Sequence, residues 1–339
     1  MRALWLTKHG GPQAFEVREA PEPTPAAGQA RVRVHAAGLN FADLLASQDL
    51  YPGAPKPPCI LGYEAAGVVD AVGEGVEAAL VGKRVMALAH FGAQAEAVCV
   101  PRRLVAIMPD AMSFEEGAAL PVNFITAYHM LHRVAHVRAG ESVLVHQAAG
   151  GVGIASLQIC RSIGGLTTFG TASSGKLPIV KSYGCTYPID YRATDYALEV
   201  RRITDGAGVD VVLDALGGAD WKKGYDLLKP CGRLICFGFA NLVGGDKRNL
   251  LRLLTQLRRV PKFNPLELMP RNRTVAGVNI GRLLDAADIL AEEMTELMRL
   301  YEAGAIKPHI DKVFPVADAV SAFLRLRQGK NVGKIVLAF

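Results

Sequence analysis

Residues 143–153 have the sequence VLVHQAAGGVG. It opens with a short apolar run that predicts a buried strand, and an apolar-periodic run typical of a helix follows from Val152 to Ile163. Between the two, Ala148, Gly150 and Gly153 occupy the three positions of a G-x-G-x-x-G loop, with Ala at the first. Small residues there permit a tight turn and close packing of the helix on the strand. The stretch predicts the first strand–turn–helix unit of a layered α/β sheet.

The same alternation continues toward the C-terminus. Further strands are predicted at 166–169, 188–190, 209–213 and 233–237, and helices near 177–183, 194–203 and 219–228. Repeated β-α units imply a parallel, doubly wound sheet. We therefore assign residues 124–264 to an α/β domain of Rossmann type.

The flanking residues have a different character. Residues 1–123 are β-rich, with strand-like alternation at 31–36 and many Gly and Pro turns. After about residue 265 we expect the chain to return to this first domain through a long amphipathic helix over 283–301 and a closing strand over 333–339. The predicted architecture is a β-rich domain, 1–123 with 265–339, into which the Rossmann domain is inserted.

Composition narrows the class of protein further. The chain has 339 residues, a formal net charge of +6 and six scattered cysteines without a C-x-x-C pair. A chain of this length needs no disulfide bonds, and no run of eighteen apolar residues occurs, so we expect a cytoplasmic protein. The basic residues are spread along the chain, and no nucleic-acid partner is expected, because charge without a recognition motif is weak support for one.

The glycine loop indicates a dinucleotide site. A helix that begins directly after such a loop presents free N–H groups and the positive end of its dipole to a pyrophosphate. We predict cofactor contacts for Ala149, Gly150, Gly151 and Val152. A ligand-free turn is the alternative for an isolated glycine triplet, but the strand before it and the β-α units after it favour the dinucleotide.

The end of the second predicted strand indicates which dinucleotide. An NAD enzyme places Asp or Glu there to accept from the ribose hydroxyls. Residues 170–176 are GTASSGK instead, without an acid. Two hydroxyls and Lys176 are available there for a 2′-phosphate, which favours NADP(H), and Gly170, Ser173 and Lys176 are predicted to contact the cofactor. The alternative for Lys176 is an ordinary solvated lysine at a helix start.

Residues 140–153, followed by Gln158 and Arg161, resemble the signature of the quinone oxidoreductase and zeta-crystallin branch of the medium-chain dehydrogenase/reductase superfamily. The likeness spans nearly the whole chain. The segments 38–43, 170–173, 224–230 and 306–311 resemble the synaptic vesicle membrane protein homologues within that branch. This resemblance implies a GroES-like catalytic domain and a homodimer built by edge-to-edge pairing of Rossmann sheets. Residues 273–278 are the candidate dimer edge; an edge strand covered by a loop is the alternative.

The resemblance also bears on metal binding. Alcohol dehydrogenases of the superfamily hold a catalytic zinc through a Cys and a His, and the matching positions here resemble Asn40 and Tyr63. Neither is a usual zinc ligand, so we expect no metal. Without a Lewis acid a simple alcohol is hard to activate, whereas a quinone or enone accepts hydride to give a delocalised anion.

Site residues follow from the same resemblance. It implies catalytic or pocket roles for Asn40, Asp43 and Tyr51, whose alternative role is loop stabilisation and packing. It implies that Asn123 and Thr126 lie near the nicotinamide, although both could be caps, and that Tyr191 lies beside the adenosine phosphate. Four further cofactor neighbours are expected: Leu216, Gly238, Asn241 and Asn331.

Residues 247–262 form a predicted basic amphipathic helix that compact enzymes lack. Its leucines share one face. The favoured interpretation is a lid or interdomain helix that packs its leucines on the body; the alternative is contact with an anionic membrane surface. The chain is thus predicted to be an NADPH-dependent reductase of quinones or enones. The rival is an NADP(H)-binding, membrane-associated adaptor or lipid-handling protein, and an RNA-binding role is a third hypothesis.

Overall fold

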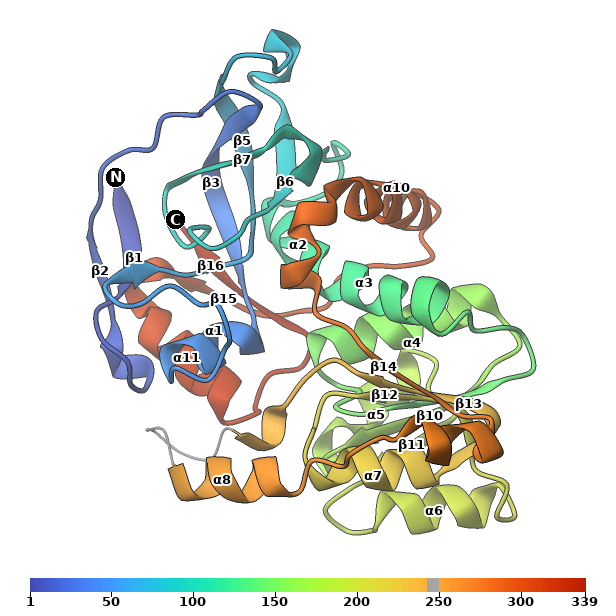
Figure 1. The fold of residues 1–339 in the computed structure, drawn as a ribbon. Coiled ribbons are helices and arrows are strands. Elements are labelled where there is room, and N and C mark those ends of the chain that lie inside the picture. Colours follow the sequence, from blue (N-terminus) through green and yellow to red (C-terminus); the bar gives the residue numbers. More distant parts are fainter. Residues whose placement is uncertain (243–249) are drawn as a thin grey trace. The chain divides into compact units, whose positions relative to one another are not determined.

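The computed structural model describes residues 1–242 and 250–339, and Leu250 without its side chain. The described chain divides into two compact units (Figure 1). The first comprises residues 1–125 and 280–339, and the second comprises residues 126–242 and 250–279. The N-terminal and C-terminal parts of the chain therefore build one unit, as the sequence predicted for its closing helix and strand.

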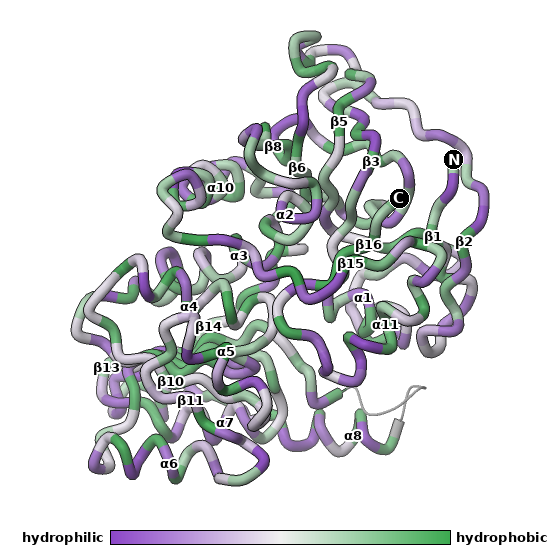
Figure 2. The backbone as a smooth tube through the Cα atoms, turned by 180° about the vertical axis from the view of Figure 1, so that it is seen from behind, coloured by the Kyte–Doolittle hydropathy of each residue, from purple (hydrophilic) through white to green (hydrophobic). Residues whose placement is uncertain are grey.

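The second unit is a six-stranded parallel sheet in the order β11-β10-β9-β12-β13-β14. Counted within the unit, this order is 3-2-1-4-5-6, the order of the Rossmann fold. Figure 2 shows mainly hydrophobic colouring around these strands. The bounds of the strands are β9 Ser142–Val145, β10 Thr167–Ala172, β11 Tyr187–Asp190, β12 Val209–Asp214, β13 Leu228–Cys236 and β14 Thr274–Gly277.

The helices of this unit connect successive strands. They are α4 Gly151–Ile163, α5 Leu177–Ser182, α6 Tyr196–Ile203, α7 Ala219–Asp226, α8 Leu250–Arg258 and α9 Pro265–Leu268. A further helix, α3 Pro121–Tyr128, crosses from the first unit into the second and continues into a π-helical turn at His129–Val134. Because β9 and β12 are neighbours from opposite halves of the chain order, their carboxyl ends form the switch point of the sheet.

One boundary differs from the sequence-based expectation. The second unit extends to Asn279 rather than ending near residue 264. The reason is β14, which pairs in parallel with β13 from Thr274 to Gly277 and so continues the Rossmann sheet. Its short sequence resembles many edge strands, and only this pairing assigns it to the second unit.

The first unit contains a seven-stranded sheet in the order β15-β16-β3-β5-β6-β8, with β7 also paired to β3, and a three-stranded sheet β2-β1-β4. Most pairings are antiparallel; β15 and β16 run parallel. The bounds of the strands are β1 Arg2–Leu6, β2 Phe15–Glu19, β3 Gln29–Leu39, β4 Cys59–Ile60, β5 Glu64–Val72, β6 Arg84–Leu88, β7 Ala97–Pro101, β8 Val105–Ile107, β15 Ile310–Pro315 and β16 Lys334–Ala338.

Three short helices and one long helix complete this unit: α1 Phe41–Ser47, α2 Phe114–Ala119, α11 Ala319–Arg327 and α10 Ala287–Glu302. The predicted start of α2 is confirmed as a capping box. Ser113 Oγ accepts from Glu116 N at 3.2 Å, and Ser113 N donates to the Glu116 carboxylate at 3.3 Å.

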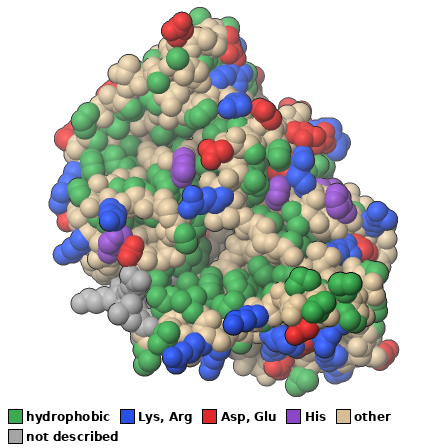
Figure 3. All heavy atoms as spheres, in the orientation of Figure 1, with side chains coloured by type: hydrophobic (Ala, Val, Ile, Leu, Met, Phe, Trp, Pro, Cys, Tyr) green, Lys and Arg blue, Asp and Glu red, His purple; other side chains and the backbone are tan. Residues whose placement is uncertain are grey.

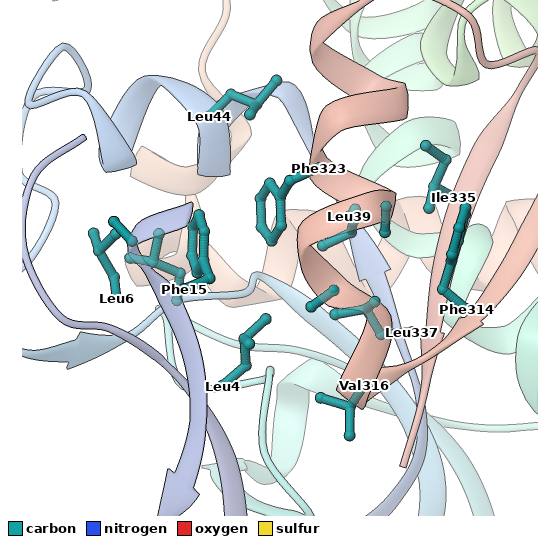
Figure 4. Close-up of a cluster of buried hydrophobic side chains, with 14 of the residues drawn as sticks. Leu4, Leu6, Phe15, Leu39, Leu44, Phe314, Val316, Phe323, Ile335 and Leu337 are labelled. Atoms are coloured by element: carbon teal, nitrogen blue, oxygen red, sulfur yellow. The ribbon is translucent and has the colours of Figure 1, made fainter. Parts of the chain in front are cut away.

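A buried cluster explains why the C-terminal part belongs to the first unit. The rings of Phe15 and Phe323 stack with centroids 4.0 Å apart, and Leu44, Leu39 and Leu337 surround them (Figure 4). These side chains come from β2, α11, α1, β3 and β16. Because the residues are far apart in sequence, their burial joins both ends of the chain into one hydrophobic core.

Candidate active site and cofactor-binding site

The loop between β9 and α4 has the geometry of an anion-binding turn. Gln147 adopts a positive φ of 52°, and Gly150 is the extended N-cap residue of α4. The first N–H bonded within this helix is that of Ile154, which donates to Gly150 O at 2.9 Å. The N–H groups of residues 151–153 precede it, as at any helix start, and so face the position of a phosphate.

Glycine is sterically required in this loop. A Cβ on Gly153 would lie 2.4 Å from Gln147 O and 2.6 Å from Ala148 Cα, so any side chain would push the helix away from the strand. A Cβ on Gly150 would come within 3.2 Å of the same carbonyl oxygen. Close packing of this loop against the strand is the role that small residues have in a pyrophosphate-binding turn.

The end of β10 adjoins this loop. A Cβ on Gly170 would be 2.8 Å from Cys185 Sγ and 2.9 Å from Ala148 Cβ, so glycine lets the two strand ends approach. Ser173 and Lys176 follow in a tight turn, in which Lys176 N donates to Ser173 O at 2.8 Å. Lys176 is half-buried. The turn holds no acid for ribose hydroxyls, which fits a 2′-phosphate.

Tyr191 belongs to the same region. Its backbone N donates to Ala172 O at 3.3 Å, and its side chain is exposed at the end of β11. The structure thus brings together Gly170, Ser173, Lys176 and Tyr191 along the carboxyl ends of adjacent strands.

A second turn lies across the switch point, after β12. Asp214 Oδ1 accepts from Leu216 N at 2.7 Å and from Gly217 N at 3.0 Å. Asn241 Nδ2 donates to Gly217 O at 3.0 Å, and a Cβ on Gly238 would lie 2.8 Å from Ala215 O. Leu216, Gly238 and Asn241 are therefore neighbours, as expected for residues that line one side of a cofactor.

In the first unit, Asp43 is the polar anchor of the predicted catalytic segment. Asn40 N donates to Asp43 Oδ2 at 2.8 Å, and Gly62 N donates to Asp43 Oδ1 at 3.2 Å. The side chain is completely buried, and burial raises the pKa of Asp43 to about 7. The two N–H donors favour the charged form, but desolvation is larger.

Two site residues were missed by the sequence analysis, Glu64 and Lys334. Glu64 is 0% exposed and Lys334 is 3% exposed. Lys334 Nζ donates to Glu64 Oε1 and, at 2.7 Å, to Asn40 Oδ1. Asn40 Nδ2 donates to Glu64 Oε1 at 2.9 Å, so the three side chains form a closed buried network.

Tyr51 lies near this network beside Tyr63. The two rings make an edge contact with centroids 5.9 Å apart, and Tyr51 also packs against the hydrophobic core of the first unit. Burial raises the pKa of Tyr63 above its usual range, and Asp43 and Tyr51 add to this. Tyr63 is therefore a neutral phenol that fills space beside Tyr51.

The remaining predicted residues make local contacts. Asn123 Nδ2 is 3.4 Å from Ala119 O, and Asn331 Nδ2 donates to Gly333 O at 2.9 Å. Thr126 lies three residues beyond Asn123 on α3 and is buried. Asn123 and Asn331 belong to the first unit and Thr126 to the second.

The basic helix departs from the favoured expectation. Within α8, Leu251, Leu254 and Leu257 are 76%, 47% and 50% exposed. Its polar side faces the body instead: Arg252 Nε donates to Asn241 O at 2.8 Å. The expectation that the leucines pack on the body is therefore wrong for Leu251, Leu254 and Leu257, whereas Leu253 is half-buried; residues 247–249 lie outside the described residues.

Within 1–242 and 250–339, no group of three His, Cys, Asp or Glu side chains is placed to hold a metal ion. Asn40, at the position that resembles a zinc ligand, directs its carboxamide to Lys334 and Glu64.

Known proteins share this arrangement. Residues 26–110 match the alcohol dehydrogenase GroES-like domain, and residues 183–337 match the zinc-binding dehydrogenase family. The synaptic vesicle membrane protein VAT-1 homolog of Rattus norvegicus is 45% identical over 339 residues, which cover 99% of this chain and 84% of the rat protein.

Solved structures agree. The human VAT-1 homolog-like protein has 37% identity and a TM-score of 0.87, over 100% of this chain and 98% of that one. Escherichia coli quinone oxidoreductase complexed with NADPH has 29% identity and a TM-score of 0.88, over 100% of both chains.

The fold and the glycine loop define a medium-chain dehydrogenase/reductase with a GroES-like unit and a Rossmann unit. Within that superfamily, the chain belongs to the quinone oxidoreductase branch and is related to the VAT-1 homologues. It is an oxidoreductase of this family that binds NADP(H). The expectations for family, fold class and cofactor are confirmed.

Proposed function

We propose that the chain is an NADPH-dependent reductase of quinones or conjugated enones that works without a metal ion. The observation that supports this most is the closed network of Asn40, Glu64 and Lys334. It includes Asn40, whose position in the sequence resembles that of a zinc ligand in the zinc-dependent members of the superfamily. A substrate that accepts hydride without Lewis-acid activation suits such a site.

In this proposal the residues of the second unit bind the cofactor and those of the first unit bind the substrate. The amides of residues 151–153 and Lys176 hold the phosphates, and the turn at Leu216 with Asn241 lines the cofactor. Bound NADPH supplies the hydride. Asn40 and Tyr51 donate hydrogen bonds to the carbonyl oxygen of the substrate. Asp43 holds the backbone of Asn40 in place by accepting from its N–H.

The direct test is consumption of NADPH with a panel of ortho-quinones, para-quinones and enones, with NADH in parallel. We expect turnover with NADPH and little with NADH. If NADPH binds but no substrate on the panel is reduced, the reductase proposal fails and a cofactor-binding adaptor takes its place.

A second function is favoured by the leucines of α8. Residues 247–262 contain six Lys or Arg and no acid, and Leu251, Leu254 and Leu257 of this segment are exposed. Figure 3 shows hydrophobic and basic side chains together at the surface next to the undescribed residues. No helix in the described part of the chain is long and apolar enough to cross a membrane. We infer that this segment lies on anionic lipid headgroups instead.

Flotation with vesicles tests this contact. The protein is expected to float with vesicles of phosphatidylcholine and phosphatidylserine but not with phosphatidylcholine alone. Replacing Leu251, Leu254 and Leu257 by Ser should abolish flotation. The matched control is Leu198→Ser, which removes a leucine that is 68% exposed on α6. Equal flotation of both variants would refute the contact.

The oligomeric state also belongs to the proposal. Among the described residues, β14 is an outermost strand of the Rossmann sheet, and its outer edge pairs with no described strand. We propose a homodimer through this edge. Sedimentation equilibrium at micromolar concentration should give twice the chain mass, and a monomer would exclude it.

A further inference from the structure

Lys334 and Glu64 belong to strands on opposite sides of β3, and the buried ammonium group of Lys334 donates to the Glu64 carboxylate. Lys334 begins β16 and Glu64 begins β5, and these two strands flank β3. Gly38 lies on β3 between them. A Cβ there would come within 2.6 Å of Lys334 Cε and 2.7 Å of Glu64 Oε1. The missing side chain at Gly38 is what lets the two charged groups meet.

Burial of this pair requires that its hydrogen-bonding groups be satisfied, because an unpaired buried charge is costly. Lys334 donates to Glu64 and to Asn40. The other oxygen of Glu64 accepts from Val122 N at 2.7 Å. Asn40 is therefore the polar side chain that completes the ion pair.

The chemistry of the partners fixes the orientation of the Asn40 carboxamide. An ammonium group has only donors and a carboxylate only acceptors. The carbonyl Oδ1 must then face Lys334, and Nδ2 must face Glu64, as the distances of 2.7 Å and 2.9 Å show. A flipped carboxamide would set donor against donor and acceptor against acceptor.

One hydrogen of Asn40 Nδ2 remains. Asn40 Nδ2 also donates to Gly38 O, but the distance of 3.5 Å is too long for a strong hydrogen bond. The carboxamide, fixed in this orientation, thus has one N–H that is only weakly hydrogen-bonded among the described residues. Its acceptor capacity is already directed at the ammonium group.

We propose that Lys334 and Glu64 are positioning residues that hold Asn40 as a hydrogen-bond donor for the carbonyl oxygen of the substrate. This inference rests on the proposed function. Hydride, with its electron pair, adds to the conjugated system of the substrate, and a π pair moves onto the carbonyl oxygen. NADP⁺ is left, and the oxyanion then takes a proton from solvent to give the reduced product. The Asn40 N–H stabilises the oxyanion before that proton arrives.

The main test is the charge-balanced double variant E64Q/K334M, which avoids leaving a single buried charge. The carboxamide of Asn40 is then free to flip. We expect the NADPH dissociation constant to stay within about twofold, because the cofactor phosphates are held by the second unit. The kcat should fall at least about tenfold, since loss of one oxyanion donor costs on the order of 10²–10³ in kcat.

A structural role would not change how the rate depends on the substrate. We therefore compare quinones with increasingly electron-withdrawing substituents. The double variant should lose most on the electron-rich quinones, whose oxyanions need the donor most. The matched control is Arg325→Met, which removes an ion pair with Asp311 in the same unit. It should lower stability and leave the substrate dependence of kcat unchanged.

A measurement without turnover separates this proposal from the proposed function. With ¹⁵N-asparagine labelling, the two Asn40 Nδ2 hydrogens, assigned through Asn40→Ser, should exchange with solvent at different rates in the unmodified protein. In E64Q/K334M both should exchange rapidly. If these exchange rates are observed but no quinone or enone is reduced, the proposal that Lys334 and Glu64 fix the orientation of the Asn40 carboxamide is supported and the reductase assignment fails. The proposal that Lys334 and Glu64 position Asn40 would be refuted by unchanged Asn40 signals in the double variant. It would also be refuted by an unchanged kcat if the unmodified protein reduces a substrate.

Discussion

His146 Nε2 lies 4.0 Å from Asp214 Oδ2, and both side chains are fully buried beneath the glycine loop. The other ring nitrogen of His146, Nδ1, lies 3.1 Å from Thr171 Oγ1. Asp214 in turn holds the Leu216 turn through its other oxygen. One imidazole therefore links the carboxyl ends of β9, β10 and β12, from which the glycine loop, the 173–176 turn and the Leu216 turn leave the sheet.

This position gives His146 a defined effect on stability. Burial lowers the pKa of His146 below 6.5, although Asp214 and Asp220 oppose the shift and Lys223 assists it. Below pH 6.5 the unfolded chain binds a proton that the native chain does not bind. The free energy of unfolding therefore decreases as the pH is lowered. The slope from this group reaches at most about 1.4 kcal/mol per pH unit and ends at the native pKa.

His146→Gln should remove that slope. Urea unfolding of the unmodified protein and of the variant, compared between about pH 7.5 and pH 5, should give curves that converge as pH falls. The buried carboxyl of Asp214, whose pKa is raised by burial, is present in both proteins. Parallel pH dependences would show that His146 titrates alike in the folded and unfolded chains.

Gly153 is the most sterically constrained position of the loop. Gly153→Ala should raise the NADPH dissociation constant at least about tenfold and lower stability by about 1–3 kcal/mol, because the new methyl group meets Gln147 O at 2.4 Å. The control is Gly10→Ala in the first unit, where the added Cβ meets only Ala14 Cβ, at an ordinary 3.7 Å. Fluorescence titration with NADPH measures both. Equal affinities would mean that the loop relaxes without cost.

The Rossmann unit was predictable because its determinants are local. The strand, the small-residue loop and the helix of 143–163 follow one another in sequence, and the missing acid at 170–176 favours NADP(H). Most of the predicted cofactor residues accordingly lie on adjacent strand ends. The side of α8 that faces the body was not predictable, because helical periodicity identifies the leucine face but not which face meets Asn241.

The role of Lys334 could not be predicted from the local sequence pattern. Nothing around it in the sequence distinguishes it from a surface lysine, and its partners Asn40 and Glu64 are far away in the chain. The contact exists because β16 and β5 lie on either side of β3, a strand order that sequence patterns do not specify. The boundary near 265 was wrong for a related reason, since the pairing of β14 with β13 is also non-local.

Lys176 should determine the preference for NADPH over NADH. A charge-assisted hydrogen bond to the 2′-phosphate contributes about 1.5–3 kcal/mol, so Lys176→Ala should weaken NADPH binding roughly 10- to 100-fold. NADH binding should change little, since NADH has no such phosphate. Lys181→Ala, at an exposed lysine on α5, is the control. Equal losses for both cofactors would place Lys176 away from the phosphate.

Asp43 should act on stability in the opposite direction from His146. Its pKa rises from 3.8 to about 7 in the folded chain, mainly through burial, so between these values the native state binds a proton that the unfolded state does not bind. The carboxyl therefore favours the folded chain at low pH, and this advantage is lost as pH rises toward 7.

Asp43→Asn cannot titrate, so its unfolding free energy should lack this dependence. The advantage of the unmodified protein over the variant should shrink between about pH 4.5 and pH 7.5, by at most about 4 kcal/mol for a shift from 3.8 to about 7. Urea unfolding of both proteins across that range measures it. The variant also replaces an acceptor of Gly62 N by an amide, which gives a constant offset rather than a slope. An advantage that grows with pH would mean that Asp43 is ionised in the fold, held by its two N–H donors and Lys334.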